Sequence, residues 1–248
     1  MFHAFAYTAT GNTISNLEMT PIQDDILSIQ NGHFLPANDM NLFGFYCGST
    51  LASFVTLNTP TLRQVSVPRM IPVSNQASPF TDPNIVDLRS NPLTLKAVEE
   101  IQLLITLATN ASPALAVALM LAGDRLDPVP RGDIVTLHGV STTTVNATGW
   151  TSLNIIFDTI LPAGRYALIG AQVVSATAIA HRFILKDQVP RPGFLSINAL
   201  SNRTAWDYPR GGMGKIGEFT TITYPIMQVL CSAADNSHDV LWHIVRLS

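Results

Sequence analysis

The sequence predicts an all-β fold built from two tandem jelly-roll β-sandwiches, and two observations support this prediction. Along most of the 248-residue chain, apolar residues either alternate with polar ones or form short β-branched runs separated by Gly, Pro, Asn and Asp. The second observation is an internal repeat whose period is close to half the length of the chain. Many short strands with turn signals between them are typical of a sandwich or barrel of the jelly-roll kind.

The expected strands are distributed over the whole chain. They cover residues 2–8, 26–30, 42–47, 51–57, 101–108, 115–121, 134–138, 150–157, 166–175, 177–185, 194–199 and 240–247. One segment also has helical features, because Asn91 suits a helix cap and Pro92 suits a first turn. From Glu100 onwards, however, alternate apolar residues share one face of a strand. We therefore expect at most a short helical turn after Pro92, followed by the strand.

The internal repeat consists of similar segments that lie about 124 residues apart. Residues 35–37 and residues 161–163 are both Leu-Pro-Ala, an offset of 126 residues (161 − 35), and Leu42 and Gly44 match Leu168 and Gly170 at the same offset. Residues 67–69 match 189–191, residues 101–121 match 226–246, and Gly11 matches Gly139. These matches keep one order at nearly one offset, so they predict a duplicated domain.

The segment 124–132 is the natural boundary between the two copies, because it combines two Pro, one Gly and four charged residues. We therefore assign residues 1–125 to a first jelly-roll sandwich and residues 126–248 to a second.

The charged residues indicate a protein that hides much of its surface in an assembly. They make up only 12% of the chain, against a typical share of about 25%. Three Lys stand against eleven Arg, and only four residues are Glu. Lys and Glu are depleted in protein–protein interfaces, whereas Arg is enriched there. A net charge of −3 without any basic run also argues against a partner bound through nucleic-acid phosphates.

Few sequence features suggest a membrane segment or a disulfide. The most apolar run, residues 114–122, is too short to span a bilayer, and the first residues have no cationic start that would suggest a signal peptide. Cys47 and Cys231 lie far apart in apolar, strand-like contexts, and we expect two buried thiols.

The motifs that could support catalysis are weak. Residues 212–217 fit the pattern G-x-G-x-x-G, but a polar loop precedes them and a β-branched segment follows, so we expect a loop and no dinucleotide site. The six His are scattered without zinc spacing, and His243 is expected to be structural. We therefore predict no enzyme and no organic cofactor. Acid pairs such as Asp24-Asp25 and Glu99-Glu100 leave a structural divalent cation such as calcium open.

With two tandem jelly rolls, few charges and no catalytic set, the chain resembles the double jelly-roll major capsid proteins of tailless icosahedral viruses, which often contain a membrane. The resemblance rests on the duplication and covers the whole length. It implies a homotrimer of pseudo-hexagonal outline, a capsid lattice, and location in a virion assembled in the host cytoplasm. The implied partners are further copies of the chain, minor capsid and penton proteins and an internal lipid membrane, without sequence-specific contact to nucleic acid.

Arginines in loops are the candidate interface residues, because bidentate pairing with carboxylates gives directional contacts between subunits. The candidates are Arg69, Arg191, Arg203 and Arg210.

Two other classes of protein remain open. A carbohydrate-binding module or a viral attachment protein would also be a β-sandwich, and Trp206 and Tyr208 would then form its aromatic platform. A cupin-like enzyme is the third reading, against which the lack of clustered His and Glu ligands counts.

Overall fold

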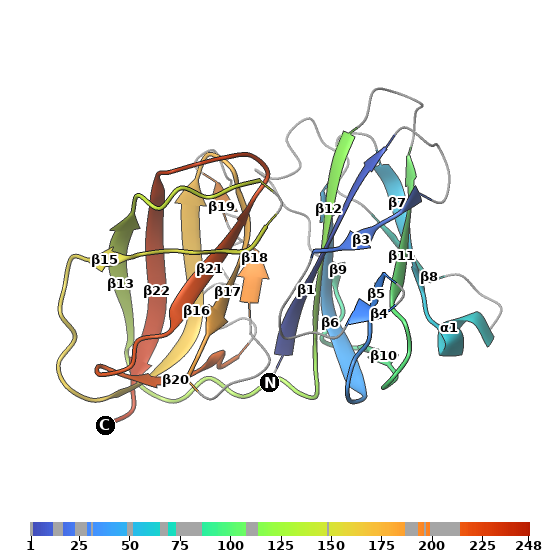
Figure 1. The fold of residues 1–248 in the computed structure, drawn as a ribbon. Helices are drawn as coiled ribbons and strands as arrows, with labels where there is room; N and C mark the ends of the chain where they lie inside the picture. Colours follow the sequence, from blue (N-terminus) through green and yellow to red (C-terminus); the bar gives the residue numbers. More distant parts are fainter. Residues whose placement is uncertain are drawn as a thin grey trace. The chain divides into compact units, whose positions relative to one another are not determined.

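A computed structural model describes residues 2–11, 17–22, 29–30, 32–48, 52–64, 69–72, 86–107, 114–147, 149–186, 193–195, 197–198 and 214–248. This part of the chain is almost entirely β-structure (Figure 1). It divides into two compact units between Asp124 and Arg125, the second of which also takes residues 2–4. We call these units the first and the second sandwich.

The first sandwich consists of two main sheets. One sheet has the order β10-β6-β12-β1-β3, with β9 also paired to β6, and the other has the order β2-β11-β7-β8. Their bounds are β1 (Phe2–Gly11), β2 (Leu17–Glu18), β3 (Thr20–Pro21), β6 (Met40–Gly48), β7 (Ala52–Asn58), β8 (Arg69–Pro72), β9 (Val86–Asp87), β10 (Leu93–Leu95), β11 (Gln102–Leu107) and β12 (Ala114–Gly123). A small hairpin, β4 (Ile29–Gln30) and β5 (His33–Phe34), and one short helix, α1 (Pro60–Gln64), complete this unit.

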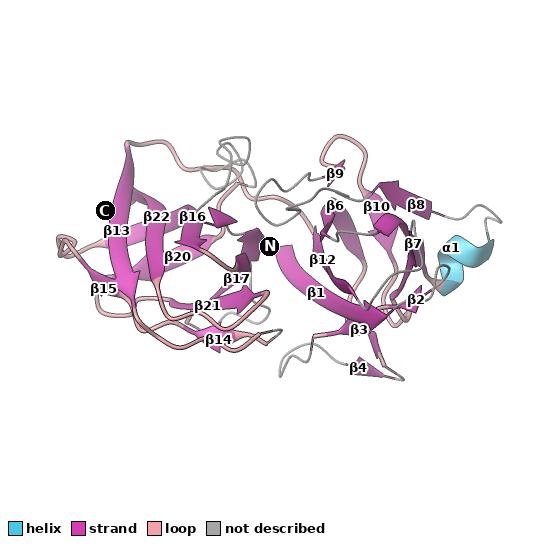
Figure 2. Ribbon diagram, turned by 90° about the horizontal axis from the view of Figure 1, so that it is seen from above, coloured by secondary structure: helices cyan, strands magenta, loops and turns pink. Residues whose placement is uncertain are grey.

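The second sandwich has the same construction. One sheet has the order β15-β13-β22-β16-β19, with β20 also paired to β16, and the other has the order β14-β21-β17-β18. Their bounds are β13 (Ile134–Ser141), β14 (Thr151–Ser152), β15 (Ile156–Phe157), β16 (Arg165–Ser175), β17 (Ala178–Ile184), β18 (Gly193–Leu195), β19 (Ile197–Asn198), β20 (Gly217–Thr220), β21 (Ile226–Cys231) and β22 (His238–Arg246). In Figure 2, β16 and β22 form one layer and β14 and β21 the other.

The two sandwiches share one topology. Four strands in the order β10-β6-β12-β1 correspond to β20-β16-β22-β13, and β2-β11-β7-β8 correspond to β14-β21-β17-β18. In both units the chain crosses repeatedly from one sheet to the other, which is the jelly-roll arrangement. The predicted fold class, two tandem jelly-roll sandwiches, is therefore confirmed.

A β-bulge at the same place in both units confirms the predicted match of Leu42 and Gly44 with Leu168 and Gly170. In the first sandwich, Leu42 and Gly44 pair with successive residues of β12, so Phe43 is the extra residue. In the second, Leu168 and Gly170 pair with successive residues of β22, so Ile169 is the extra residue. A bulge bends its strand and redirects the side chains beyond it.

The repeat needs two corrections of register. Leu121 pairs with Gly44 and His243 pairs with Gly170, so β12 matches β22 at an offset of 122 residues (243 − 121) instead of the expected 125. The other correction concerns β11 and β21. The sequence match placed residue 101 on residue 226, but the ladders pair Asn58 with Gln102 and Ile184 with Ile226. Asn58 and Ile184 are equivalent positions of the repeat, because they are 126 residues apart, the offset that also relates β6 to β16. Their partners are therefore equivalent too, so Gln102 corresponds to Ile226 at an offset of 124 residues (226 − 102). Alternating apolar residues gave the strand correctly, but they could not fix its register to a single residue.

The expected helical turn after Pro92 is wrong. Leu93–Leu95 is strand β10, which pairs antiparallel with Met40–Leu42 of β6, and Leu95 is completely buried. Pairing and burial outweigh the weak local preference for a helix. The short helix of the first sandwich is α1 instead, where the Leu62 backbone N–H donates to Thr59 Oγ1 as in an N-cap.

Each sandwich has an aromatic core. In the first, the ring of Phe34 lies edge-on to Phe5 and Tyr7, with ring centroids 5.3 and 5.1 Å away. In the second, the fully buried Trp242 lies edge-on to Phe183 and Phe157, at 5.5 and 4.9 Å. Cys47 and Cys231 are free and buried, as predicted.

Candidate functional site

Of the predicted interface and platform residues, Arg69 alone lies in the described part of the chain. Arg69 is the first residue of β8, where its backbone pairs with Leu57 of β7. The other candidates lie outside the described residues: Arg191, Arg203, Arg210, Trp206 and Tyr208.

The G-x-G-x-x-G segment does not form a dinucleotide site. Gly217 begins strand β20, and no helix follows it within residues 214–248. Gly214 has a φ of +79°, and a Cβ built on it would lie 2.0 Å from the Asp127 carbonyl oxygen. The next N–H, that of Lys215, donates to the same oxygen over 2.8 Å. This glycine therefore allows two backbone segments to meet, which a larger residue would prevent.

Cys231 and His238 lie close together in the core, as in a thiol catalyst, but the cysteine is not activated. Cys231 Sγ and His238 Nε2 lie 4.0 Å apart, and Thr177 Oγ1 donates to the nearby Asp235. Burial raises the pKa of Cys231 to about 11, and burial lowers the pKa of His238. A nucleophilic cysteine needs a lowered pKa and access to solvent. The thiol is therefore protonated at neutral pH, and we assign the group to the core.

The described residues offer little else for catalysis or a cation. No group of three or more His, Cys, Asp and Glu among them could hold a metal ion. His243 is buried on β22, and its Nδ1 lies 3.0 Å from Thr136 Oγ1 of the paired strand, which fits the structural role expected for it. No helix in these ranges is long and apolar enough to cross a membrane.

The outer face of β13 and β15 carries exposed apolar side chains. Ile134 and Val140 alternate along β13 with the buried Leu137, and Ile156 of β15 pairs with Val140. They are 41%, 40% and 69% exposed. We call these three residues the outer apolar patch. Val140 and Ile156 are cross-strand neighbours, and Ile134 lies six residues (140 − 134), or about 20 Å, further along the same face of β13. Apolar side chains left in solvent on one face are typical of a surface that contacts another molecule.

A histidine between two carboxylates lies on the same face. His138 Nδ1 forms an ion pair with Asp158, and its Nε2 lies 3.8 Å from Asp239 of β22. The hydrogen bond to Asp158, with the charges of both carboxylates, raises the pKa of His138. The patch is therefore bordered by a group whose charge changes near neutral pH.

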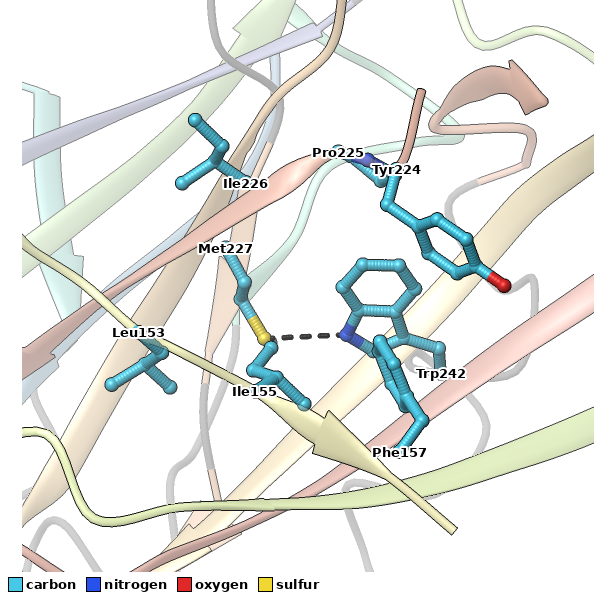
Figure 3. A pocket seen from close by; sticks show the side chains of 8 residues that line it. All are labelled: Leu153, Ile155, Phe157, Tyr224, Pro225, Ile226, Met227 and Trp242. Atoms are coloured by element: carbon cyan, nitrogen blue, oxygen red, sulfur yellow. Dashed lines mark hydrogen bonds between the residues drawn. The ribbon is translucent and has the colours of Figure 1, made fainter. Parts of the chain in front are cut away.

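The second sandwich also contains an apolar pocket of about 340 Å³ (Figure 3). Figure 3 shows Trp242 and Phe157 on one side, Leu153 and Ile155 on another, and Tyr224 beside the indole. Pro225, Ile226 and Met227 complete the lining, which contains no charged residue. Sequence reasoning missed the pocket, because its residues come from three separate segments, 153–157, 224–227 and residue 242, and each segment reads as ordinary core.

No protein-family model matches the chain, and no curated protein matches it. Among solved structures, the chain is similar to the major capsid protein P2 from bacteriophage PM2, with 8% sequence identity and a TM-score of 0.27. The similarity covers 100% of this chain and 98% of that chain. Because this TM-score is low, we assign the fold from the strand order of the chain itself and not from the similarity.

Proposed function

We propose that the chain is a major capsid protein, a structural subunit that forms homotrimers and then an icosahedral shell. The observation that carries this proposal is the presence of two jelly rolls of identical strand order in one chain. Three such chains around one axis supply six similar sandwiches. A ring of six similar units fits a hexagonal lattice, and closed symmetry lets one interface be used repeatedly.

The surface of the second sandwich supports assembly. The outer apolar patch exposes three β-branched side chains on the face of a sheet, and the chain has few of the Lys and Glu residues that keep a monomer soluble. The subunit would work in a virion assembled in the host cytoplasm, together with minor capsid and penton proteins and above an internal membrane, and without catalysis.

The mass of the protein in solution tests the proposal. The chain has a mass of 26.8 kDa, so light scattering behind a sizing column should give about 80 kDa for a trimer. Electron microscopy of the same sample should show hexagonal outlines or closed shells. A protein that stays monomeric at high concentration overturns the proposal.

Substitutions separate the two kinds of contact that the proposal invokes. Changing Val140→Lys and Ile156→Lys together should reduce the trimer fraction, because both charges enter the apolar patch. The four candidate arginines, of which Arg69 lies in strand β8 and not in the expected loop, are tested as one fourfold change to Ala, with the exposed Arg131→Ala as the control. If neither the double Lys variant nor the fourfold Ala variant changes the trimer fraction, the outer apolar patch and the arginines are not subunit contacts. Whether the protein forms a trimer at all is decided separately, by the mass of the unaltered protein.

A further inference from the structure

The repeat gives the pocket of the second sandwich a counterpart in the first. Met19 N–H donates to Leu103 O over 2.9 Å, and Leu153 N–H donates to Met227 O over the same distance. Leu103 and Met227 correspond at the offset of 124 residues established for β11 and β21, so Met19 corresponds to Leu153. At this offset Ile101 corresponds to Pro225, which also lines the pocket.

A phenyl ring fills the counterpart region of the first sandwich. Phe34 is only 1% exposed and belongs to one buried cluster with Met19, Ile101 and Leu103. Its carbonyl oxygen accepts a hydrogen bond of 3.0 Å from Ile101 N–H. Hairpin β4–β5 therefore carries an aromatic ring into the core at this point.

The second sandwich has a shorter connection at the equivalent place. Pro21, the last residue of β3, and Met40, the first of β6, are 19 residues apart (40 − 21), whereas Phe157, the last residue of β15, and Arg165, the first of β16, are 8 residues apart (165 − 157). Ile160 stands at the position of Phe34 in the repeat, and it is 91% exposed. The residue at the Phe34 position thus does not enter the core of the second sandwich, and the pocket lies beside the rings of Phe157, Tyr224 and Trp242.

The lining favours a small molecule over a peptide strand. Pro225 has no N–H, so a visiting strand could not form the backbone hydrogen bond that Ile101 gives to Phe34. Trp242 Nε1–H already donates to Met227 Sδ over 3.4 Å (Figure 3). The inner wall therefore offers apolar contact and few free polar groups, which suits a ligand without charge.

We propose that this pocket binds an uncharged apolar molecule, either an aromatic compound of two rings or an alkyl chain of similar size. An engineered apolar cavity of about 150 Å³ stays dry and binds benzene. The pocket here, at about 340 Å³, has room for roughly twice that ligand and opens to solvent at the half-exposed Ile226 and Tyr224. The ligand takes the place that Phe34 holds in the first sandwich, against Trp242, Phe157 and Leu153.

The experiment uses N-phenylnaphthylamine, an uncharged dye whose emission rises in apolar surroundings, with the full-length protein. Ile155→Phe adds a ring to the pocket wall and should weaken dye binding at least tenfold. Ile222→Phe is the matched control, because Ile222 is 92% exposed and does not line the pocket. It should leave binding within twofold of the unaltered protein. Circular dichroism verifies that both variants fold.

A second readout separates the pocket from nonspecific dye binding. Naphthalene at saturation should raise the unfolding temperature of the unaltered protein and of Ile222→Phe, but not that of Ile155→Phe, because a ligand stabilises only the state that binds it. Equal dye binding by both variants, or no binding by the unaltered protein, overturns the proposal. If Ile155→Phe instead changes the mass of the protein in solution, the pocket is a contact between copies of the chain and the proposal is wrong.

Discussion

Phe34 and Ile160 occupy the same position in the repeat, and we expect opposite responses when each is changed to Ala. Phe34 is 1% exposed and contacts two aromatic rings, whereas Ile160 is 91% exposed. Removing a buried phenyl ring costs about 3–5 kcal/mol of unfolding free energy. Truncating a solvent-exposed side chain changes it by less than about 0.5 kcal/mol. One repeat position should therefore give a large effect in one copy and almost none in the other.

The two cysteines allow the effect to be assigned to one sandwich. Cys47 and Cys231 are free and buried, one in each unit, and alkylation in increasing urea followed by mass spectrometry reports when each becomes accessible. At a slope of about 2 kcal/mol per M urea, a loss of about 4 kcal/mol lowers the midpoint by about 2 M. We expect that shift at Cys47 for Phe34→Ala.

The emission of the three tryptophans, Trp150, Trp206 and Trp242, provides an independent signal, because residues 1–125 contain no Trp. Ile160→Ala should leave both the Cys231 midpoint and the Trp transition in place. The reasoning is refuted if Ile160→Ala shifts the second sandwich as far as Phe34→Ala shifts the first. It is also refuted if the Cys47 midpoint of Phe34→Ala stays within about 0.3 M of the unaltered protein.

Two further predictions concern a glycine and a histidine of the second sandwich. Gly214→Ala should destabilise this unit by about 2 kcal/mol or more in urea unfolding, because the new Cβ meets the Asp127 carbonyl at a positive φ; Gly149→Ala, with open space around it, is the control and should cost less than about 0.5 kcal/mol. His138→Gln should cost up to about 0.5 kcal/mol at pH 5.5 and nothing at pH 9, because the raised pKa of His138 gives stability that is present below its unfolded value and lost as the pH rises through the folded one. A cost for His138→Gln that grows with pH would contradict this assignment.

The fold class could be predicted because the strand patterns and the repeat are both visible in the order of the residues. The match of Leu42 and Gly44 with Leu168 and Gly170 survived in the structure as a shared bulge. The segment after Pro92 was misread, since its strand depends on pairing with β6, which lies about 50 residues earlier in the chain. Local propensity cannot report such a partner.

The site could not be predicted in the same way. The pocket exists because a connection is shorter in the second copy, and its lining residues look like core residues when they are read one segment at a time. The signal was present in the repeat itself. Aligning Phe34 with Ile160 places an aromatic residue against an aliphatic one directly before the shared Leu-Pro-Ala, but only the burial of one and the exposure of the other show that the difference matters.

Strands and connections of a duplicated sandwich are under different physical constraints, and this explains where the two copies differ. A slip of one residue in a strand turns every side chain to the other face, so the registers and even the bulge are held in both copies. A connection on the surface can lengthen or shorten at small entropic cost. The difference between hairpin β4–β5 and the short segment after β15 is of this kind. Copies that share a framework can therefore differ in their connections, so that one fills its own core and the other leaves a pocket.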